Sequence, residues 1–306
     1  MRRRDFIQKV STGTTALAAI GSLGLQSFAP KPKATKITIL HTNDVHSHID
    51  TFGPDEGRNA NKGGVARRAA LIDSIRQQNP NTLLFDAGDI FQGTPYFNYY
   101  GGELEIKLMS KLKYDLATIG NHDFDNGING FYAQLPHADF NFVSANYDFS
   151  STLLDTHVKP YQIFKKGGVK IGVFGLGIEL NGLVEKRLYK ETKYLDPIEI
   201  TQDITRILKY DEQCDLIICL SHLGYDYRNN PDKISDLKLA KLTKDIDLII
   251  GGHTHTFLSK PSIVKNSENK ELLVNQVGCY GLYLGQIDFF FDTNKNKTAK
   301  GVSITV

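Results

Sequence analysis

The sequence is poor in cysteine and has no long hydrophobic run. Its three cysteines, Cys214, Cys219 and Cys279, are too few for a disulfide framework, and the absence of a Cys-x-x-Cys pair argues against a zinc site built from thiolates. No apolar run reaches the roughly 18 residues of a membrane-spanning helix. These absences exclude a disulfide-stapled protein and a polytopic membrane protein.

The sequence also carries little net charge. The 306 residues have a formal charge of +2, of which residues 1–30 hold +3 and the remainder −1. Because a near-neutral body attracts polyanions weakly, we expect no nucleic-acid polymer as a partner. Hydrophobic residues at 41% and charged residues at 23% are ordinary for a globular protein, which excludes a disordered chain, a collagen and a coiled coil.

The N-terminal residues have the features of a signal peptide. Arg2, Arg3 and Arg4 precede a short apolar stretch at residues 16–25 that glycine and serine dilute. The pair Arg3-Arg4, followed by Phe6 and Lys9, resembles a twin-arginine signal. We therefore expect a signal peptide at 1–29, a linker at 30–35 and an exported bacterial protein of the periplasm or cell envelope, without a membrane span in its mature form. The alternative is a frayed basic N-terminus.

From residue 36 onward, β-type and helical patterns alternate, and the last fifty residues contain β-type patterns only. Helices are expected at 64–77, 103–111, 198–208 and 234–242. Strands are expected at 36–41, 82–86, 115–119, 141–145, 161–164, 170–174, 215–220, 246–250, 262–264, 272–277, 283–291 and 302–306. This order predicts an α/β fold with a purely β end, in one catalytic domain at 36–306.

Five of the expected strands end in clusters of residue types that bind metals. The clusters are Asp44 with His46, Asp89, Asn121 with His122, His222, and His253 with His255. Ligands of open α/β sheets bind at the carboxyl ends of strands. Residues i and i+2 of extended backbone point to the same side, so each spaced pair is expected to aim two ligands at one point. A mixed nitrogen and oxygen set suits zinc, manganese or iron better than calcium.

These clusters lie in motifs that resemble a known family. The motifs are LHTNDVH at 40–46, Gly88-Asp89, QGTP at 92–95, GNHDFD at 120–125, Ser221-His222 and GGHTH at 251–255. Together they resemble the calcineurin-like metallophosphoesterase superfamily, and within it the 5'-nucleotidase/UDP-sugar hydrolase family. The resemblance implies a four-layer αββα sandwich, in which two mixed sheets are flanked by helices.

The resemblance also implies a role for each residue. Asp44, His46 and His255 would hold one divalent metal ion, Asn121, His222 and His253 a second, and Asp89 would bridge the two. The ions could be Zn, Mn, Fe, Co or Mg, and a metal-bridging hydroxide would attack phosphorus. His122 would stabilise the transition state or assist the leaving group, and Asp125 would orient His122 or, alternatively, cap a helix. Asp123 stands where many members have Glu, and no role is assigned to it.

The expected activity is hydrolysis of phosphate monoesters, with 5'-nucleotides favoured. Hydrolysis of UDP-sugars or other diphosphates, cyclic nucleotides or sulfur esters is the alternative at the same site, and a non-catalytic metal-binding scaffold is a third hypothesis. The C-terminal nucleotide-specificity domain of larger relatives is expected to be absent. Such a domain could come from a separate chain.

Several other residues are expected to be structural. His41, at a strand end beside the site, is expected to support the site from behind its ligands or to be structural, His48 to lie in a solvated loop, and His137 and His157 on the surface. The aromatic run at 96–100 is expected to be a loop packed on its own domain, although it could stack on a base. Cys214 and Cys219 are expected in the core.

Overall fold

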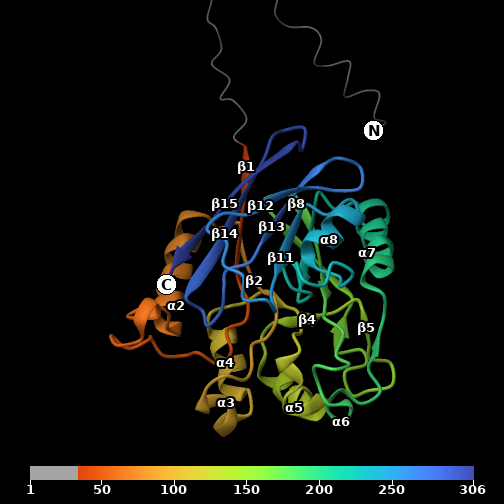
Figure 1. Cartoon of the computed structure of the whole chain (residues 1–306). Coiled ribbons are helices and arrows are strands. Elements are labelled where there is room, and N and C mark those ends of the chain that lie inside the picture. Colours follow the sequence, from red (N-terminus) through yellow and green to blue (C-terminus); the bar gives the residue numbers. More distant parts are fainter. Residues whose placement is uncertain (1–33) are drawn as a thin grey trace, which may run out of the picture. The chain divides into compact units, whose positions relative to one another are not determined.

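Two large sheets form the centre of the structure, a computed structural model that describes residues 34–306 (Figure 1). The first sheet has the order β15-β14-β1-β2-β3-β4-β6, and the run from β1 to β6 is parallel. Its strands are β1 (Thr35–Thr42), β2 (Thr82–Asp86), β3 (Leu116–Ala117), β4 (Asn141–Val143), β6 (Val158–Lys159), β14 (Tyr283–Phe291) and β15 (Lys297–Thr305). β14 and β15 close the sheet in antiparallel fashion.

The second sheet has the order β12-β13-β11-β10-β8-β7, with a parallel centre and antiparallel edges. Its strands are β7 (Tyr161–Lys166), β8 (Val169–Leu176), β10 (Leu216–Ser221), β11 (Leu248–Gly251), β12 (Ser262–Lys265) and β13 (Glu271–Asn275). β7 and β8, which contain the predicted strands 161–164 and 170–174, form an antiparallel hairpin around Gly167-Gly168. A separate two-stranded sheet pairs β5 (Tyr147–Asp148) with β9 (Lys193–Tyr194).

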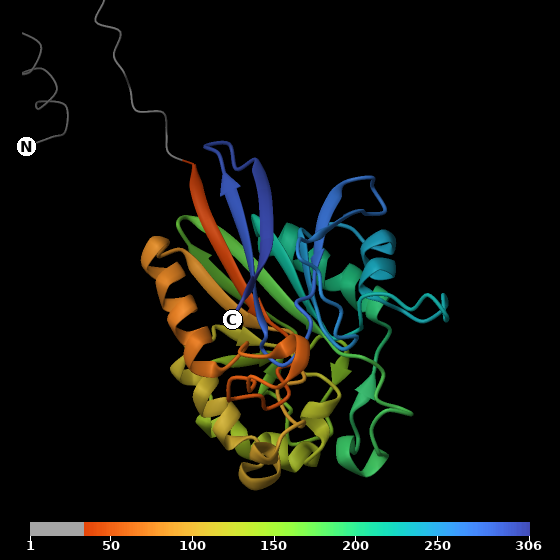
Figure 2. The same ribbon diagram turned by 60° about the vertical axis from the view of Figure 1, so that its left-hand side comes forward.

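The helices cover the outer faces of the two large sheets (Figure 2). They are α2 (Val65–Gln78), α3 (Pro95–Tyr100), α4 (Glu103–Lys111), α5 (Gly127–Gln134), α6 (Lys186–Tyr189), α7 (Pro197–Arg206), which continues as a π-helix at Ile207–Asp211, and α8 (Asp236–Leu242), with short 3-10 turns at Gly57–Asn59, His122–Phe124 and Leu135–His137.

Three apolar cores join these layers. One lies between the sheets, where Ile37 and Ile39 of β1 share a cluster with Val173 of β8 and Ile218 of β10. A second core joins the first sheet to α2, α4 and α5, and a third joins the second sheet to α7 and α8. Both faces of each sheet are therefore covered, which explains the continuous apolar strands. The four-layer αββα architecture that the resemblance implies is confirmed.

The main differences from the predicted elements have local causes. The aromatic run at 96–100 is not a loop but lies in α3, which begins with Pro95 at its first position, a residue whose fixed φ suits a helix start. α5 is absent from the expected helices and is implied only by the alternative role of Asp125 as a cap. It contains Gly127 and Gly130, which disfavour helix, and burial of Ile128 and Phe131 supplies the stabilisation instead. β15 begins at Lys297 and not at the predicted residue 302. The sequence pattern misses its first residues because they are mostly exposed and show no apolar alternation.

The predicted signal peptide at 1–29 lies outside the described residues, as does the predicted linker except for Ala34 and Thr35. Between residues 34 and 306, no helix is long and apolar enough to cross a membrane.

Candidate metal centre

The carboxyl ends of strands from both sheets bring the predicted clusters together. Loops after β1, β2 and β3 of the first sheet meet loops after β10 and β11 of the second. The side chains form two groups whose ligand atoms lie within 4.8 Å of one another: Asp44 with His46 and His255, and Asp89 with His222 and His253. Asn121 adjoins the second group, with its Oδ1 2.8 Å from Nδ1 of His253.

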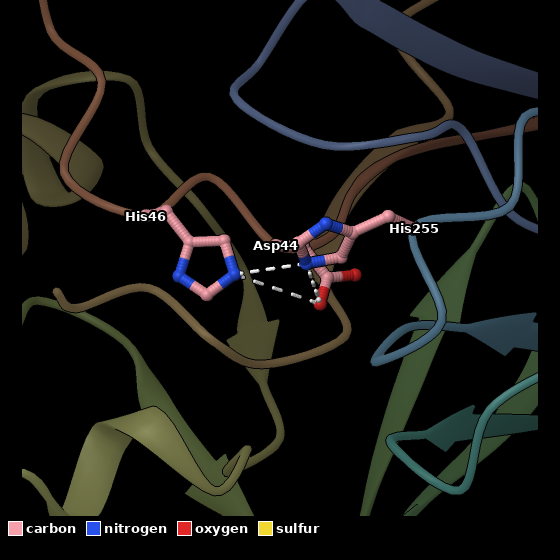
Figure 3. A group of neighbouring side chains, drawn as sticks. All are labelled: Asp44, His46 and His255. Carbon is pink, nitrogen blue, oxygen red and sulfur yellow. Dashed lines mark hydrogen bonds and ion pairs between the residues drawn. The ribbon is translucent and has the colours of Figure 1, made fainter. Parts of the chain in front are cut away.

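The first group converges on one point (Figure 3). Nε2 of His46 and Nε2 of His255 are 3.0 Å apart, and Oδ1 of Asp44 is 3.4 Å from Nε2 of His255. Hydrogen bonding to Asp44, and then to Cys279, raises the pKa of His255 to about 10. These two imidazole nitrogens can share a proton, and together with the carboxylate oxygen they form a mixed nitrogen and oxygen donor set that also fits a divalent cation.

Asp89 belongs to the second group and also lies close to the first. Its Oδ2 is 3.0 Å from Nε2 of His222 and 3.8 Å from Nε2 of His46. Burial disfavours a charge on His222, but the carboxylates of Asp89 and Asp44 outweigh it and raise the His222 pKa to about 10. Within the described chain, His222 Nε2 is buried without a well-aligned hydrogen bond. A divalent cation would satisfy this atom and both carboxylates at once.

Backbone carbonyls orient two of the histidines. Nδ1 of His46 lies 3.1 Å from the carbonyl oxygen of Phe91, and Nδ1 of His222 lies 2.7 Å from that of Ala87. A proton on Nδ1 that is donated to the carbonyl leaves the Nε2 lone pair free to bind a metal. Both rings are therefore held in the tautomer and the direction that a metal ligand requires.

The ligand pairs do not converge by strand alternation. Asp44, His46, His253 and His255 have φ values of 50°, 51°, 71° and 51°, so that each lies in the left-handed region and not in extended backbone. Asp44 and His46 do come together, but the expectation that extended backbone aims them at one point is wrong. A left-handed backbone costs a non-glycine residue energy, and hydrogen bonds such as that from the His253 N–H to Asp44 Oδ1 (2.9 Å) hold it in place.

His122 and Asp125 form a hydrogen-bonded pair beside the two groups. Nδ1 of His122 is 2.9 Å from Oδ2 of Asp125, and this hydrogen bond raises the pKa of His122 above its ordinary value. The His122 ring packs edge-on against His46, with centroids 5.3 Å apart. The alternative of Asp125 as a helix cap is wrong, because Asn126 occupies the N-cap of α5.

Asp123 has a structural role that the sequence interpretation missed. Its buried carboxylate accepts backbone N–H groups from Gly120 (2.8 Å), Asp89 (3.1 Å), Ile90 (2.9 Å) and Phe91 (3.2 Å). Burial, together with the charge of Asp89, raises the Asp123 pKa to about 7. The position next to Asn121-His122 is the available signal, but three of the four contact partners, residues 89–91, are 32 to 34 positions away in sequence.

The remaining histidines divide into interior and surface residues. His41 is fully buried and its Nε2 lies 2.9 Å from Nδ2 of Asn275, which agrees with a structural role. His48 lies in a loop and is partly exposed, and its ring also stacks on Phe52 at 5.2 Å. His157 is exposed and His137 is partly exposed, as expected.

The cysteine and aromatic assignments have mixed outcomes. Cys214 and Cys219 are buried, as predicted. Of the aromatic run, only Phe97 is buried, whereas Tyr99 is 86% exposed and Tyr100 is 50% exposed. The expectation that this run packs on its own domain is therefore wrong for these two tyrosines.

Comparisons with known proteins agree with this geometry. A family model described as calcineurin-like phosphoesterase matches residues 37–257. The chain is 33% identical over 282 residues to a snake venom 5'-nucleotidase from Crotalus adamanteus, covering 85% of this chain and 46% of that protein. It is 33% identical over 313 residues to the 5'-nucleotidase of Homo sapiens, covering 92% of this chain and 50% of that protein.

A solved structure extends the comparison to the fold. The crystal structure of a 5'-nucleotidase precursor from Thermus thermophilus matches with a TM-score of 0.80 at 34% identity, covering 89% of this chain and 55% of that one. The chain thus spans about half the length of the relatives that it matches.

Proposed function

The chain belongs to the calcineurin-like phosphoesterase family. We propose that it is a two-metal phosphoesterase that hydrolyses phosphate monoesters, with 5'-nucleotides favoured. The observation that carries the proposal is the position of Asp89 between two groups of histidine and carboxylate side chains. One carboxylate shared by two ligand groups is the arrangement that a pair of close cations requires.

We assign Asp44, His46 and His255 to the first ion, Asn121, His222 and His253 to the second, and Asp89 to both. Bound divalent ions would supply Lewis acidity toward the phosphate and lower the pKa of a coordinated water. The mixed donor set accepts Zn, Mn, Fe, Co or Mg, so metal supply decides the identity.

The chain's own contribution to proton transfer is His122. Asp125 holds the ring through Nδ1 and favours its charged form, so Nε2 carries the proton that a leaving oxygen needs. Because the His122 ring packs against His46, this proton is held beside the first ligand group. Asp123 maintains the backbone of Asp89 and so positions the shared carboxylate.

The preference for nucleotides is supported by the three relatives described above, which are all named 5'-nucleotidases. The test is a substrate panel with the purified protein and manganese or zinc: AMP, UDP-glucose, 2',3'-cyclic AMP and p-nitrophenyl phosphate. We expect AMP to be the best substrate and chelation to abolish turnover of all four. Activity that persists after metal removal has been verified by elemental analysis would overturn the two-metal mechanism.

We also propose that residues 1–29 direct export through a twin-arginine route. Residues 1–35 fused to a reporter should carry it out of the cytoplasm, and replacement of Arg3-Arg4 by Lys-Lys should stop this. Undiminished export of the Lys-Lys fusion would refute the proposal.

A further inference from the structure

Three aromatic side chains form a partly exposed cluster beside the first ligand group. The Tyr280 ring lies 4.2 Å from the His48 ring and 6.2 Å from the Phe52 ring, and His48 stacks on Phe52 at an interplanar angle of 11°. All three side chains are only partly buried. None of them is a ligand in the assignment above, and the proposed hydrolysis leaves them without a role.

The backbone holds Tyr280 in this position at an energetic cost. Its φ is 63°, in the left-handed region that a bulky aromatic residue rarely adopts. The Tyr280 N–H donates to the carbonyl oxygen of Asp44 at 2.7 Å, which ties the loop to the first ligand group. Strained backbone of this kind clusters where a side chain must be placed for function.

The position of the Tyr280 ring relates it to the reacting atoms. The ring lies 6.1 Å from the His46 ring and 5.9 Å from the His255 ring. His46 also contacts His122, the proposed proton donor, at 5.3 Å. A single imidazole ring thus separates His122 from Tyr280. An organic group attached to an oxygen protonated by His122 can extend along His46 to reach Tyr280.

We propose that Tyr280, supported by His48 and Phe52, is a specificity-determining surface on which the planar base of a nucleotide stacks while its phosphate occupies the metal centre. The proposal rests on the proposed function, because it assumes that phosphate binds at the two ligand groups. Stacking on an aromatic face contributes affinity for any base without reading its edges. The surface therefore selects nucleotides over phosphate esters of sugars and small alcohols, and does not distinguish adenine from other bases.

The test compares AMP with ribose 5-phosphate, which lacks the base. Asn tolerates left-handed backbone, so Tyr280→Asn removes the ring while keeping the loop conformation and its N–H. We expect the ratio of kcat/KM for AMP to that for ribose 5-phosphate to fall about tenfold, mainly through KM for AMP, as base–aromatic stacking implies. Tyr280→Phe should retain the wild-type ratio. Tyr210→Asn is the matched control, because Tyr210 is 60% exposed.

The outcomes separate this inference from the proposed function. An unchanged ratio in Tyr280→Asn, or an equal loss on both substrates with reduced metal content, overturns the stacking role and leaves the phosphoesterase intact. If the wild type hydrolyses neither ester, the proposed function fails. Calorimetric binding of AMP and ribose 5-phosphate to the same variants then decides the inference: a loss of AMP affinity alone supports it, and equal affinities overturn it.

Discussion

The carboxylate of Asp123 accepts the backbone N–H of Asp89, with Oδ2 3.1 Å from the nitrogen. This bond fixes the main chain of the residue whose side chain lies between the two ligand groups. Since Asp123 also accepts N–H groups from Gly120, Ile90 and Phe91, one buried carboxylate shapes the loops after β2 and β3 together.

Asp123→Asn should therefore destabilise the protein and weaken metal binding. The substitution replaces an acceptor oxygen by an NH₂ group that faces backbone N–H donors. We expect the free energy of unfolding to fall by about 1–3 kcal/mol, the cost of an unsatisfied buried polar group. Urea denaturation and elemental analysis are the measurements. Asp139→Asn, at an exposed position, is the control. Wild-type stability and metal content in Asp123→Asn would show that these hydrogen bonds are dispensable.

Loss of His122 should slow the reaction without loss of metal. His122→Ala is expected to lower kcat by about 10²-fold or more, as removal of a general acid does. Asp125→Asn should give a smaller loss, because the ring remains but its 2.9 Å carboxylate partner is gone. Steady-state kinetics with metal analysis measure both. His157→Ala alters an exposed histidine and serves as control. Wild-type turnover in His122→Ala would remove His122 from the mechanism.

A methyl group at Gly120 should disturb the shared carboxylate. A Cβ at this position would lie 2.5 Å from the backbone nitrogen of Asp89 and 2.8 Å from its Cγ, so Asp89 must move. We expect Gly120→Ala to bind less than its full complement of metal and to lose most activity. Gly53→Ala is the matched control, because the nearest atom to its Cβ is 3.8 Å away. Full metal occupancy in Gly120→Ala would contradict the prediction, because it would show that the loop accommodates the methyl group without displacing Asp89 from its position.

The buried His41 should make stability depend on pH on the acid side. Burial lowers its pKa from 6.5 to about 3, so below pH 6.5 the unfolded chain binds a proton that the folded chain does not. The contribution of His41 to stability is therefore fully present above about pH 6.5 and is lost as the pH drops toward 3, by up to about 1.4 kcal/mol per pH unit. His41→Gln, which cannot be protonated, should show a shallower fall in urea denaturation measured across this window. Parallel curves for wild type and variant would contradict the prediction.

Much of the fold was predictable because local patterns carry it. The apolar run of β2 and the alternating run of β14 have the predicted bounds, 82–86 and 283–291. The helix α4 likewise spans the predicted 103–111, since its buried residues recur at helical spacing. By contrast, α5 depends on burial of Ile128 and Phe131 under the first sheet, which no local propensity reveals.

The candidate donor residues were also predictable, because each follows a recognisable strand. Their grouping came from the family resemblance, because no local pattern specifies it. His46 and His255, which are 209 positions apart, place their Nε2 atoms 3.0 Å from each other. The contacts of Asp123 with Asp89 and of Tyr280 with Asp44 depend on left-handed turns that bring distant loops together.

Most α/β elements, the family and the chemical types of the candidate donor side chains could be read from hydrophobic periodicity and short motifs, and the family resemblance implied that Asp89 is shared between two groups. The contacts of Asp123 with the Asp89 backbone and of Tyr280 with the Asp44 backbone are visible in the folded chain alone. They depend on how the carboxyl ends of two packed sheets meet, which local interactions along the chain do not specify.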